Sequence, residues 1–141
     1  MSLQAVLLPV FVQVGLTFLL GFWMGFVRTS TIGRGEVKIR DIALGQPGWT
    51  EEGTKVGNAF RNQFELPVLF YVLVVLALFA RKADLLFVIM SWIFVATRIV
   101  HAAIHTDSNR VPRRFYAYLV GAIVLLVMWI IFAVRVLLGL G

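Results

Sequence analysis

The 141-residue chain contains no cysteine and few charged residues. The absence of cysteine excludes disulfides, thiolate metal sites and a protein thiol as a nucleophile. Charged residues make up 14% of the chain and only 7 are acidic, whereas 60% of the residues are hydrophobic. Soluble domains rarely contain so large an apolar fraction. The composition therefore predicts several membrane spans and leaves little chain for a separate soluble domain.

The charges that are present are mostly basic, with 13 Lys and Arg residues and a formal net charge of +6. In a soluble protein this balance would suggest nucleic-acid binding, but the chain has no nucleic-acid motif and no extended basic face. The basic residues cluster instead beside apolar runs, as the orientation signals of membrane proteins do. We therefore expect membrane lipids, and no nucleic acid, among the partners.

Four apolar segments predict four membrane-spanning helices, over residues 3–27, 57–80, 85–105 and 115–140. Each approaches or exceeds the roughly 20 residues that cross a bilayer. The first segment lacks the basic start and cleavage site of a signal peptide, so we expect it to be retained. The expected fold class is an all-α membrane protein, with one four-transmembrane-helix bundle over residues 1–141.

The connections between the segments predict their orientation. Residues 81–84 form a tight turn, which makes the second and third segments a hairpin, whereas residues 28–56 are expected to form a long mobile surface loop. Most Lys and Arg residues lie in this loop and in the connection before the fourth segment. The positive-inside rule then places both connections in the cytoplasm and both termini outside, with a bacterial inner membrane as the expected location.

Polar residues gather at the predicted cytoplasmic ends of the second and third segments. Within each segment they recur at short intervals: Asn58, Arg61, Asn62 and Glu65 in the second, and Arg98, His101 and His105 in the third. A helix places residues three or four apart on one face. Because a hairpin joins the two segments, we expect the two polar faces to meet.

Two interpretations of this cluster remain open. An ionisable side chain costs about 2.5–3.5 kcal/mol at the bilayer centre and less near the interface. A Glu65–Arg98 ion pair would lower that cost and only fix the helix register. A polar pocket would lower it as well, and intramembrane ionisable residues are functional candidates. Such a pocket favours a ligand with several carboxylates, bound by arginine, and one ammonium, bound by Glu65.

Three short motifs resemble one family of membrane proteins. "NQFE" (62–65) begins the second segment and is followed by Pro67, "RIVHAAIH" (98–105) ends the third, and "NRVPRR" (109–114) precedes the fourth. Their order resembles the MAPEG family, the membrane-associated proteins in eicosanoid and glutathione metabolism. The resemblance covers residues 58–121. It implies a homotrimer of left-handed four-helix bundles with glutathione bound between subunits, near the cytoplasmic side.

The resemblance also implies roles for single residues in glutathione binding. Asn62 and Glu65 match the family's glutathione-binding pair, and Arg98 matches its third-helix arginine. His101 and His105 match positions that carry a polar ring, often tyrosine, in other members.

In active members, an arginine near the start of the fourth helix stabilises the glutathione thiolate. Arg110, Arg113 and Arg114 all compete for this role, with Arg114 preferred because it lies nearest the helix. Some members carry an arginine four residues before the motif asparagine, where this chain has Asn58. Whether Arg61, adjacent to Asn62, replaces that arginine stays open from the sequence. The implied activity is a transferase or peroxidase that uses glutathione as co-substrate on lipophilic electrophiles or lipid hydroperoxides.

Two other functions remain open from the sequence. The first is a non-catalytic lipid-binding or scaffold protein of the same fold. The second is a metal site, because His101 and His105 are spaced as paired ligands on a helix. The first histidine lacks the adjacent Glu of zinc hydrolases, and there are too few further ligands for a di-iron centre, so no metal is expected.

Other polar and aromatic residues of the spans favour structural roles. Tyr116 and Tyr118 are typical of an interfacial aromatic belt, although either is within reach of the expected pocket. Gln4 and Gln13 in the first segment are expected to hydrogen-bond across helices rather than bind a ligand.

Overall fold

The computed structural model describes residues 1–141 and contains five α-helices, one 3₁₀ turn and no strand. In chain order these are α1 (Leu3–Gly33), η1 (Ile39–Asp41), α2 (Glu51–Asn62), α3 (Leu66–Phe79), α4 (Leu85–Thr106) and α5 (Val111–Leu137). Four stretches are long and apolar enough to cross a membrane, with α2 and α3 together forming the second. The predicted all-α class is confirmed.

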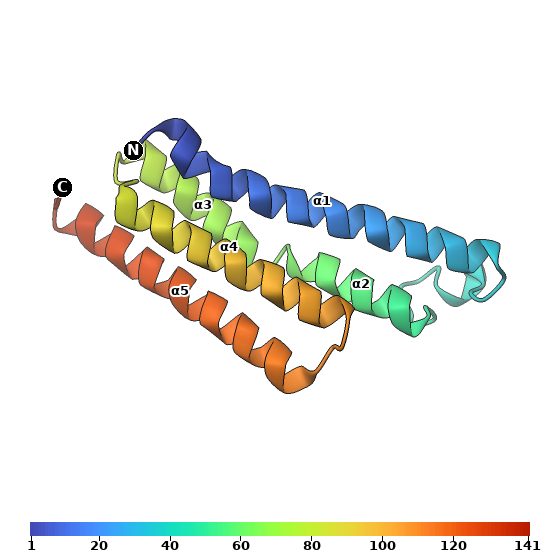
Figure 1. Cartoon of the computed structure of the whole chain (residues 1–141). Helices are drawn as coiled ribbons and strands as arrows, with labels where there is room; N and C mark the ends of the chain where they lie inside the picture. Colours follow the sequence, from blue (N-terminus) through green and yellow to red (C-terminus); the bar gives the residue numbers. More distant parts are fainter.

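The helices form one elongated bundle in which α2 and α3 follow one another beside the long α1 (Figure 1). Helix α4 packs against α1, α2 and α5. Both chain termini lie at the same end of the bundle, here called the terminal end. The α1–α2 and α4–α5 connections lie toward the opposite end, here called the loop end. The 31 residues of α1 span about 46 Å, more than the hydrocarbon thickness of a bilayer.

The loop between the first two spans is shorter than the predicted residues 28–56. Helix α1 continues to Gly33 and α2 begins at Glu51, because Thr50 caps α2 by accepting the Gly53 N–H at 3.2 Å. A hydroxyl cap followed by acidic residues is a favourable helix start. The Arg28 guanidinium also lies 4.5 Å from the Trp49 ring centroid, which ties the loop back onto α1.

Helix α5 begins and ends earlier than the predicted 115–140. It starts at Val111 because Pro112 occupies the first turn, where its missing N–H needs no partner. It ends at Leu137, and Gly139 follows with a φ of 66°, a left-handed conformation that glycine adopts without strain.

The second predicted span, 57–80, is broken instead of forming one continuous helix. Pro67 has no N–H to donate to the carbonyl of Gln63, and its ring would clash with that carbonyl in a continuous helix. The chain therefore leaves helical geometry at Glu65, whose ψ is −106°, before α3 starts. This α2–α3 break separates a polar half of the bundle from an apolar half.

The apolar half, toward the terminal end, contains the main hydrophobic core. Its fully buried members come from α1, α3, α4 and α5 and include Phe70, Leu73, Phe94 and Leu125. Because lipid tails are as apolar as this core, it stabilises the bundle through close van der Waals packing between the helices. The core fixes the helices on one side of the break, so that the polar residues on the other side lie on a rigid frame.

Candidate functional site

A cavity of about 520 Å³ opens beside the α2–α3 break, between α2, α4 and α5. It lies on the loop-end side of the main core. Its lining is predominantly polar and comprises Asn58, Arg61, Asn62, Glu65, His101, His105, Val111, Arg114, Phe115 and Tyr118. Seven of the residues that the sequence singled out are therefore brought together here.

Arg98 lies behind this lining and is 0% exposed. Its Nη1 donates to Oδ1 of Asn62 at 3.3 Å, and its Nη2 donates to the carbonyls of Ala117 and Tyr118 at 3.2 and 3.4 Å. No carboxylate pairs with it. Arg98 therefore reaches the cavity through Asn62, and its charge is met inside the chain only by neutral groups.

A glycine on α5 makes room for the Arg98 guanidinium. A Cβ on Gly121 would lie 2.6 Å from Nη2 of Arg98 and 2.7 Å from Oγ1 of Thr97. Both distances are shorter than real carbon contacts. The close approach of α4 and α5 at this point thus depends on the absence of a side chain.

Asn62 connects Arg98 to Glu65. Its Oδ1 accepts from Arg98, while its Nδ2 donates to Oε1 of Glu65 at 2.6 Å. The direct Glu65–Arg98 ion pair that the sequence allowed is not formed, because the amide lies between the two groups. Glu65 itself is exposed and lines the cavity, so its carboxylate is accessible to a cation.

Two histidine rings of α4 form one wall of the cavity. The centroids of His101 and His105 are 5.4 Å apart, and His101 lies 5.8 Å from the ring of Tyr118. Nδ1 of His101 and both ring nitrogens of His105 have no hydrogen-bond partner in the chain. Buried polar atoms are normally paired, so this wall offers unused hydrogen-bonding groups. No group of three or more possible metal ligands gathers in the structure.

The three candidate thiolate arginines take different positions at the start of α5. Arg114 lines the cavity, and its Nη1 donates to Oδ1 of Asn109 at 2.7 Å. Arg110 is the N-cap residue of α5, and both Arg110 and Arg113 are exposed outside the cavity. Successive helical residues turn by about 100°, so adjacent arginines cannot share a direction. Only Arg114 of the three lies where a ligand in the cavity could be reached.

An apolar groove of about 490 Å³ runs between α3 and α5, starting next to the break. Its lining is wholly hydrophobic: Leu66, Leu69, Ala122, Leu125, Leu126 and Trp129. Leu66 follows Glu65 directly, so one end of the apolar groove lies at the same break that borders the polar cavity. A polar and an apolar reactant could therefore approach each other there.

Two residues of α5 have a closer relation to the site than the sequence predicted. Tyr118 was expected first as a belt residue, but it lines the cavity and its ring lies 5.1 Å from the Arg98 guanidinium carbon. Gly121, beside the Arg98 guanidinium, was not a predicted site residue. The helical spacing of Tyr118 and Gly121 from Arg114, at four and seven residues, is the signal that places them on one face of α5.

The fold and site together define an all-helical membrane bundle with a cation-rich cavity at a helix break. A model of the MAPEG family matches residues 6–134, so the chain belongs to the MAPEG family and the resemblance is confirmed. The protein is therefore an integral multi-pass membrane protein whose function lies, at family level, in membrane glutathione or eicosanoid metabolism. Neither the curated proteins nor the solved structures contain a match to the chain.

Proposed function

We propose that the protein is a glutathione-dependent membrane transferase or peroxidase that acts on lipophilic electrophiles or lipid hydroperoxides. The observation that carries this proposal is the charge balance of the cavity. Arg61 and Arg114 line it and Arg98 lies directly behind it, against the single carboxylate of Glu65. Glutathione has two carboxylates and one ammonium, which is the complementary pattern.

The lining residues suggest how the tripeptide is held. The guanidinium of Arg61 is exposed at the cavity and can bind a carboxylate in a two-pronged contact. Glu65 can bind the ammonium, and Asn62 and the two histidines supply further hydrogen bonds. Arg98 holds the Asn62 amide in place and adds its charge to the cavity. We further propose a homotrimer, in which a neighbouring subunit covers the open side of the site.

Arg114 is the proposed activator of the thiol. A free thiol with a pKa of about 8.5 is mostly protonated at neutral pH, and a nearby guanidinium favours the thiolate. In conjugation the thiol proton leaves to solvent, and the thiolate sulfur bonds to the electrophilic carbon while the leaving group departs. In the peroxidase reaction, two glutathione molecules become one disulfide and the hydroperoxide becomes an alcohol and water.

The apolar groove between α3 and α5 is the proposed approach for the lipophilic reactant. It contains no polar lining residue, and Leu66 places its end beside the polar cavity. Partition into the membrane would concentrate an apolar electrophile at this surface. The same groove also supports the rival function, a non-catalytic lipid-binding protein, which predicts retained lipid but no glutathione turnover.

The orientation proposed for the chain puts the loop end in the cytoplasm and both termini outside. The loop end carries most of the Lys and Arg residues that flank the spans, which favours the cytoplasmic side. Soluble glutathione would then enter the cavity from the cytoplasm. Labelling of single cysteines placed at Leu44, which is exposed in the first loop, and at Gly141 with a membrane-impermeant reagent tests this orientation.

Substitution of the three arginines tests the enzyme assignment. With an aryl halide as electrophile, Arg114→Ala should lower kcat roughly 100-fold, as loss of one electrostatic stabiliser commonly does. Arg110→Ala and Arg113→Ala are matched controls and should retain near wild-type kcat. Full activity in the three single variants and in the triple variant would refute the thiolate assignment. Retained lipid with no turnover in the wild type would support the rival.

A further inference from the structure

Two glutamines meet inside the membrane span, away from the cavity lining. Gln13 of α1 is 0% exposed, and Gln63, within the α2–α3 break, is 2% exposed. Nε2 of Gln13 donates to Oε1 of Gln63 at 2.7 Å, across 50 residues of sequence. Nε2 of Gln63 in turn donates to the carbonyl of Ala59 at 3.0 Å. This hydrogen bond is the cross-helix bond expected for Gln13, and its acceptor, Gln63, lies within the α2–α3 break.

The bond from Gln63 to Ala59 replaces a main-chain bond that the break removes. In a continuous helix the N–H of Gln63 would donate to the carbonyl four residues earlier, that of Ala59. Here the chain tightens, and this N–H donates to the carbonyl of Phe60 at 3.0 Å instead. Ala59 is fully buried, and an unpaired carbonyl in an apolar membrane interior is costly. The side-chain amide of Gln63 therefore satisfies it.

Gln63 is in turn held by α1. Once its Nε2 is committed to Ala59, its Oε1 points to Gln13, which supplies the donor. Gln63 also follows Asn62 directly and precedes Glu65 by two residues, and both Asn62 and Glu65 face the cavity. Its own side chain lines the opposite, α1-facing side of α2 and is absent from the cavity lining. The orientation of the break is thus fixed from α1.

We propose that Gln13 and Gln63 are positioning residues that clamp the α2–α3 break and thereby hold Asn62 and Glu65 in the geometry that binds the ligand. Neither glutamine touches the cavity. Displacements near 1 Å can greatly weaken binding or catalysis, and the break is the one point in the second span where such displacements are not opposed by a helix. The inference rests on the proposed function in naming glutathione as the ligand.

A simple interhelical bond would behave differently from a clamp. Hydrogen bonds between membrane helices stabilise the fold, so loss of any of them lowers thermal stability. Only a positioning role predicts that the folded protein also binds glutathione more weakly. Ser91 supplies the matched control, because its Oγ donates to the Phe87 carbonyl at 2.8 Å and it is likewise 0% exposed, but on α4 within the main core.

The test measures glutathione affinity by calorimetry on detergent-purified protein, together with hydrogen exchange of the backbone amides between Asn62 and Val68. Gln13→Leu should weaken binding about 10-fold and speed exchange across the break, whereas Ser91→Ala should change neither. Gln13→Asn is the milder variant, because it keeps the amide but is too short to reach Gln63. It should give the same direction of change if Gln13→Leu does not fold.

A double variant sharpens the result. Because Gln13 acts only by holding Gln63, Gln13→Leu combined with Gln63→Leu should weaken binding no more than Gln63→Leu alone. Wild-type affinity and wild-type exchange in a folded Gln13→Leu or Gln13→Asn variant would overturn the clamp. If the wild type itself binds no glutathione, the proposed function fails, and the exchange measurement still decides the clamp by the same criterion.

Discussion

Two arginines of the bundle have opposite surroundings. At the terminal end, Nη1 of Arg135 on α5 lies 2.8 Å from Oδ2 of Asp84, which also caps α4. On the loop-end side of the break, Arg98 is fully buried and bonds only to an amide and two carbonyls. One positive charge is neutralised by a carboxylate of the chain, and the other is not.

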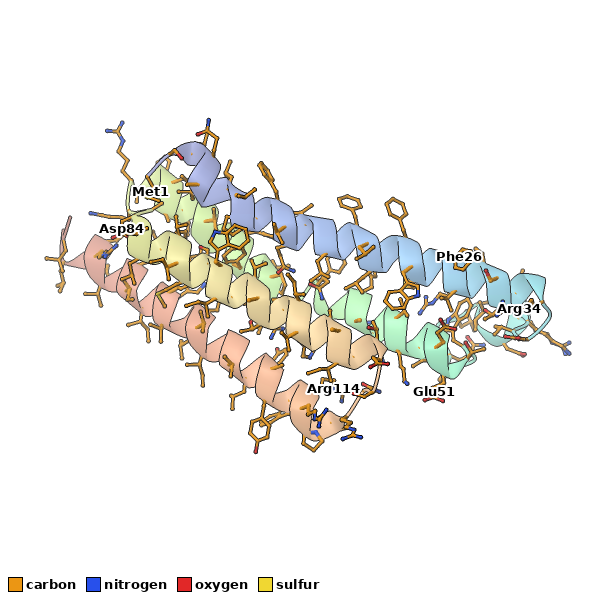
Figure 2. The ribbon with its side chains drawn as sticks, viewed as in Figure 1. Met1, Phe26, Arg34, Glu51, Asp84 and Arg114 are labelled. Carbon is orange, nitrogen blue, oxygen red and sulfur yellow. The ribbon has the colours of Figure 1, made fainter.

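The difference is consistent with a structural role for Arg135 and with the ligand-binding role proposed for Arg98. A buried unpaired charge is expensive, whereas Arg135 is only partly buried and is paired with Asp84. The charge of Arg98 lies beside a cavity to which Arg61 and Arg114 add two more. Figure 2 shows Asp84, the partner of Arg135, at the terminal end and Arg114 of the cavity toward the loop end. In the proposed function, carboxylates of the ligand balance this excess of positive charge.

Removal of Arg98 should have the largest effect on binding. We expect Arg98→Met to weaken glutathione binding about 10- to 100-fold, because a charged hydrogen bond contributes about 1.5–3 kcal/mol and Asn62 loses its partner. Arg135→Met should leave the affinity unchanged and lower the melting temperature. Calorimetry and thermal unfolding of both variants make the comparison. Equal loss of affinity in both variants would remove the distinction between the two arginines.

Removal of the Glu65 carboxylate should have a smaller and chemically specific effect. Glu65→Gln keeps the shape of the side chain and an oxygen that can accept from Asn62, but loses the charge for the ammonium. We expect about 10-fold weaker glutathione binding, in line with one charged contact. The informative control is an analogue that lacks the amino group, since wild type and variant should bind it equally. An unequal result would mean that Glu65 acts on something other than the ammonium.

A methyl group at Gly121 tests how closely Arg98 is held. Gly121→Ala would place a carbon against the Arg98 guanidinium, so we expect lower affinity and about 1–3 kcal/mol lower stability, as for other overpacked sites. Gly25→Ala on α1 is the matched control, because its added carbon would meet nothing within 4 Å. In calorimetry and thermal unfolding, Gly25→Ala should keep wild-type affinity and should not lower the melting temperature, since Ala favours the helix over Gly, whereas Gly121→Ala should lower both. No effect at Gly121 would show that the guanidinium can move freely.

The ion pair at the terminal end should affect stability alone, and with the smallest magnitude. Burial by itself would raise the pKa of the Asp84 carboxyl, but the Phe87 N–H and the Arg135 guanidinium outweigh it and lower that pKa below its ordinary value. The stabilisation is therefore complete above the unfolded pKa of about 3.9 and is lost as the pH falls through the lower folded pKa.

Asp84→Asn keeps an N-cap oxygen and removes the charge, so it isolates the ion pair. Its melting temperature should lie a few degrees below that of wild type near neutral pH, and the difference should shrink as the pH falls below about 4. Glutathione affinity should not change. A difference that stays constant with pH would show that the carboxylate charge is not what stabilises this end.

The sequence predicted the members of the site better than their arrangement. Helical spacing placed Asn58, Arg61 and Asn62 together, and hairpin topology brought them to the third span, because both depend on local geometry. The α2–α3 break was not predicted, although Pro67 is visible, because proline within a membrane span is often tolerated. With the second span taken as one continuous helix, a direct Glu65–Arg98 ion pair was one of the two open interpretations.

Other features depend on contacts between residues far apart in sequence. The sequence does not indicate which residue of the other three spans bonds to Gln13. The burial of Arg98 depends on the space left by Gly121. Helix α1 extends beyond residue 27, and there the Arg28 guanidinium stacks on Trp49 of the following loop. The apolar pattern of residues 28–33 does not by itself predict a helix. Tertiary packing determines these features, and spacing along the chain does not record it.

Recognition of the glutathione carboxylates by the cavity is tested most directly by calorimetry on the wild-type protein. Glutathione is compared with the diester in which both carboxylates are blocked. We expect saturable binding of glutathione and none of the diester at the same concentrations. Equal binding of both compounds, or no binding of either, would contradict this recognition.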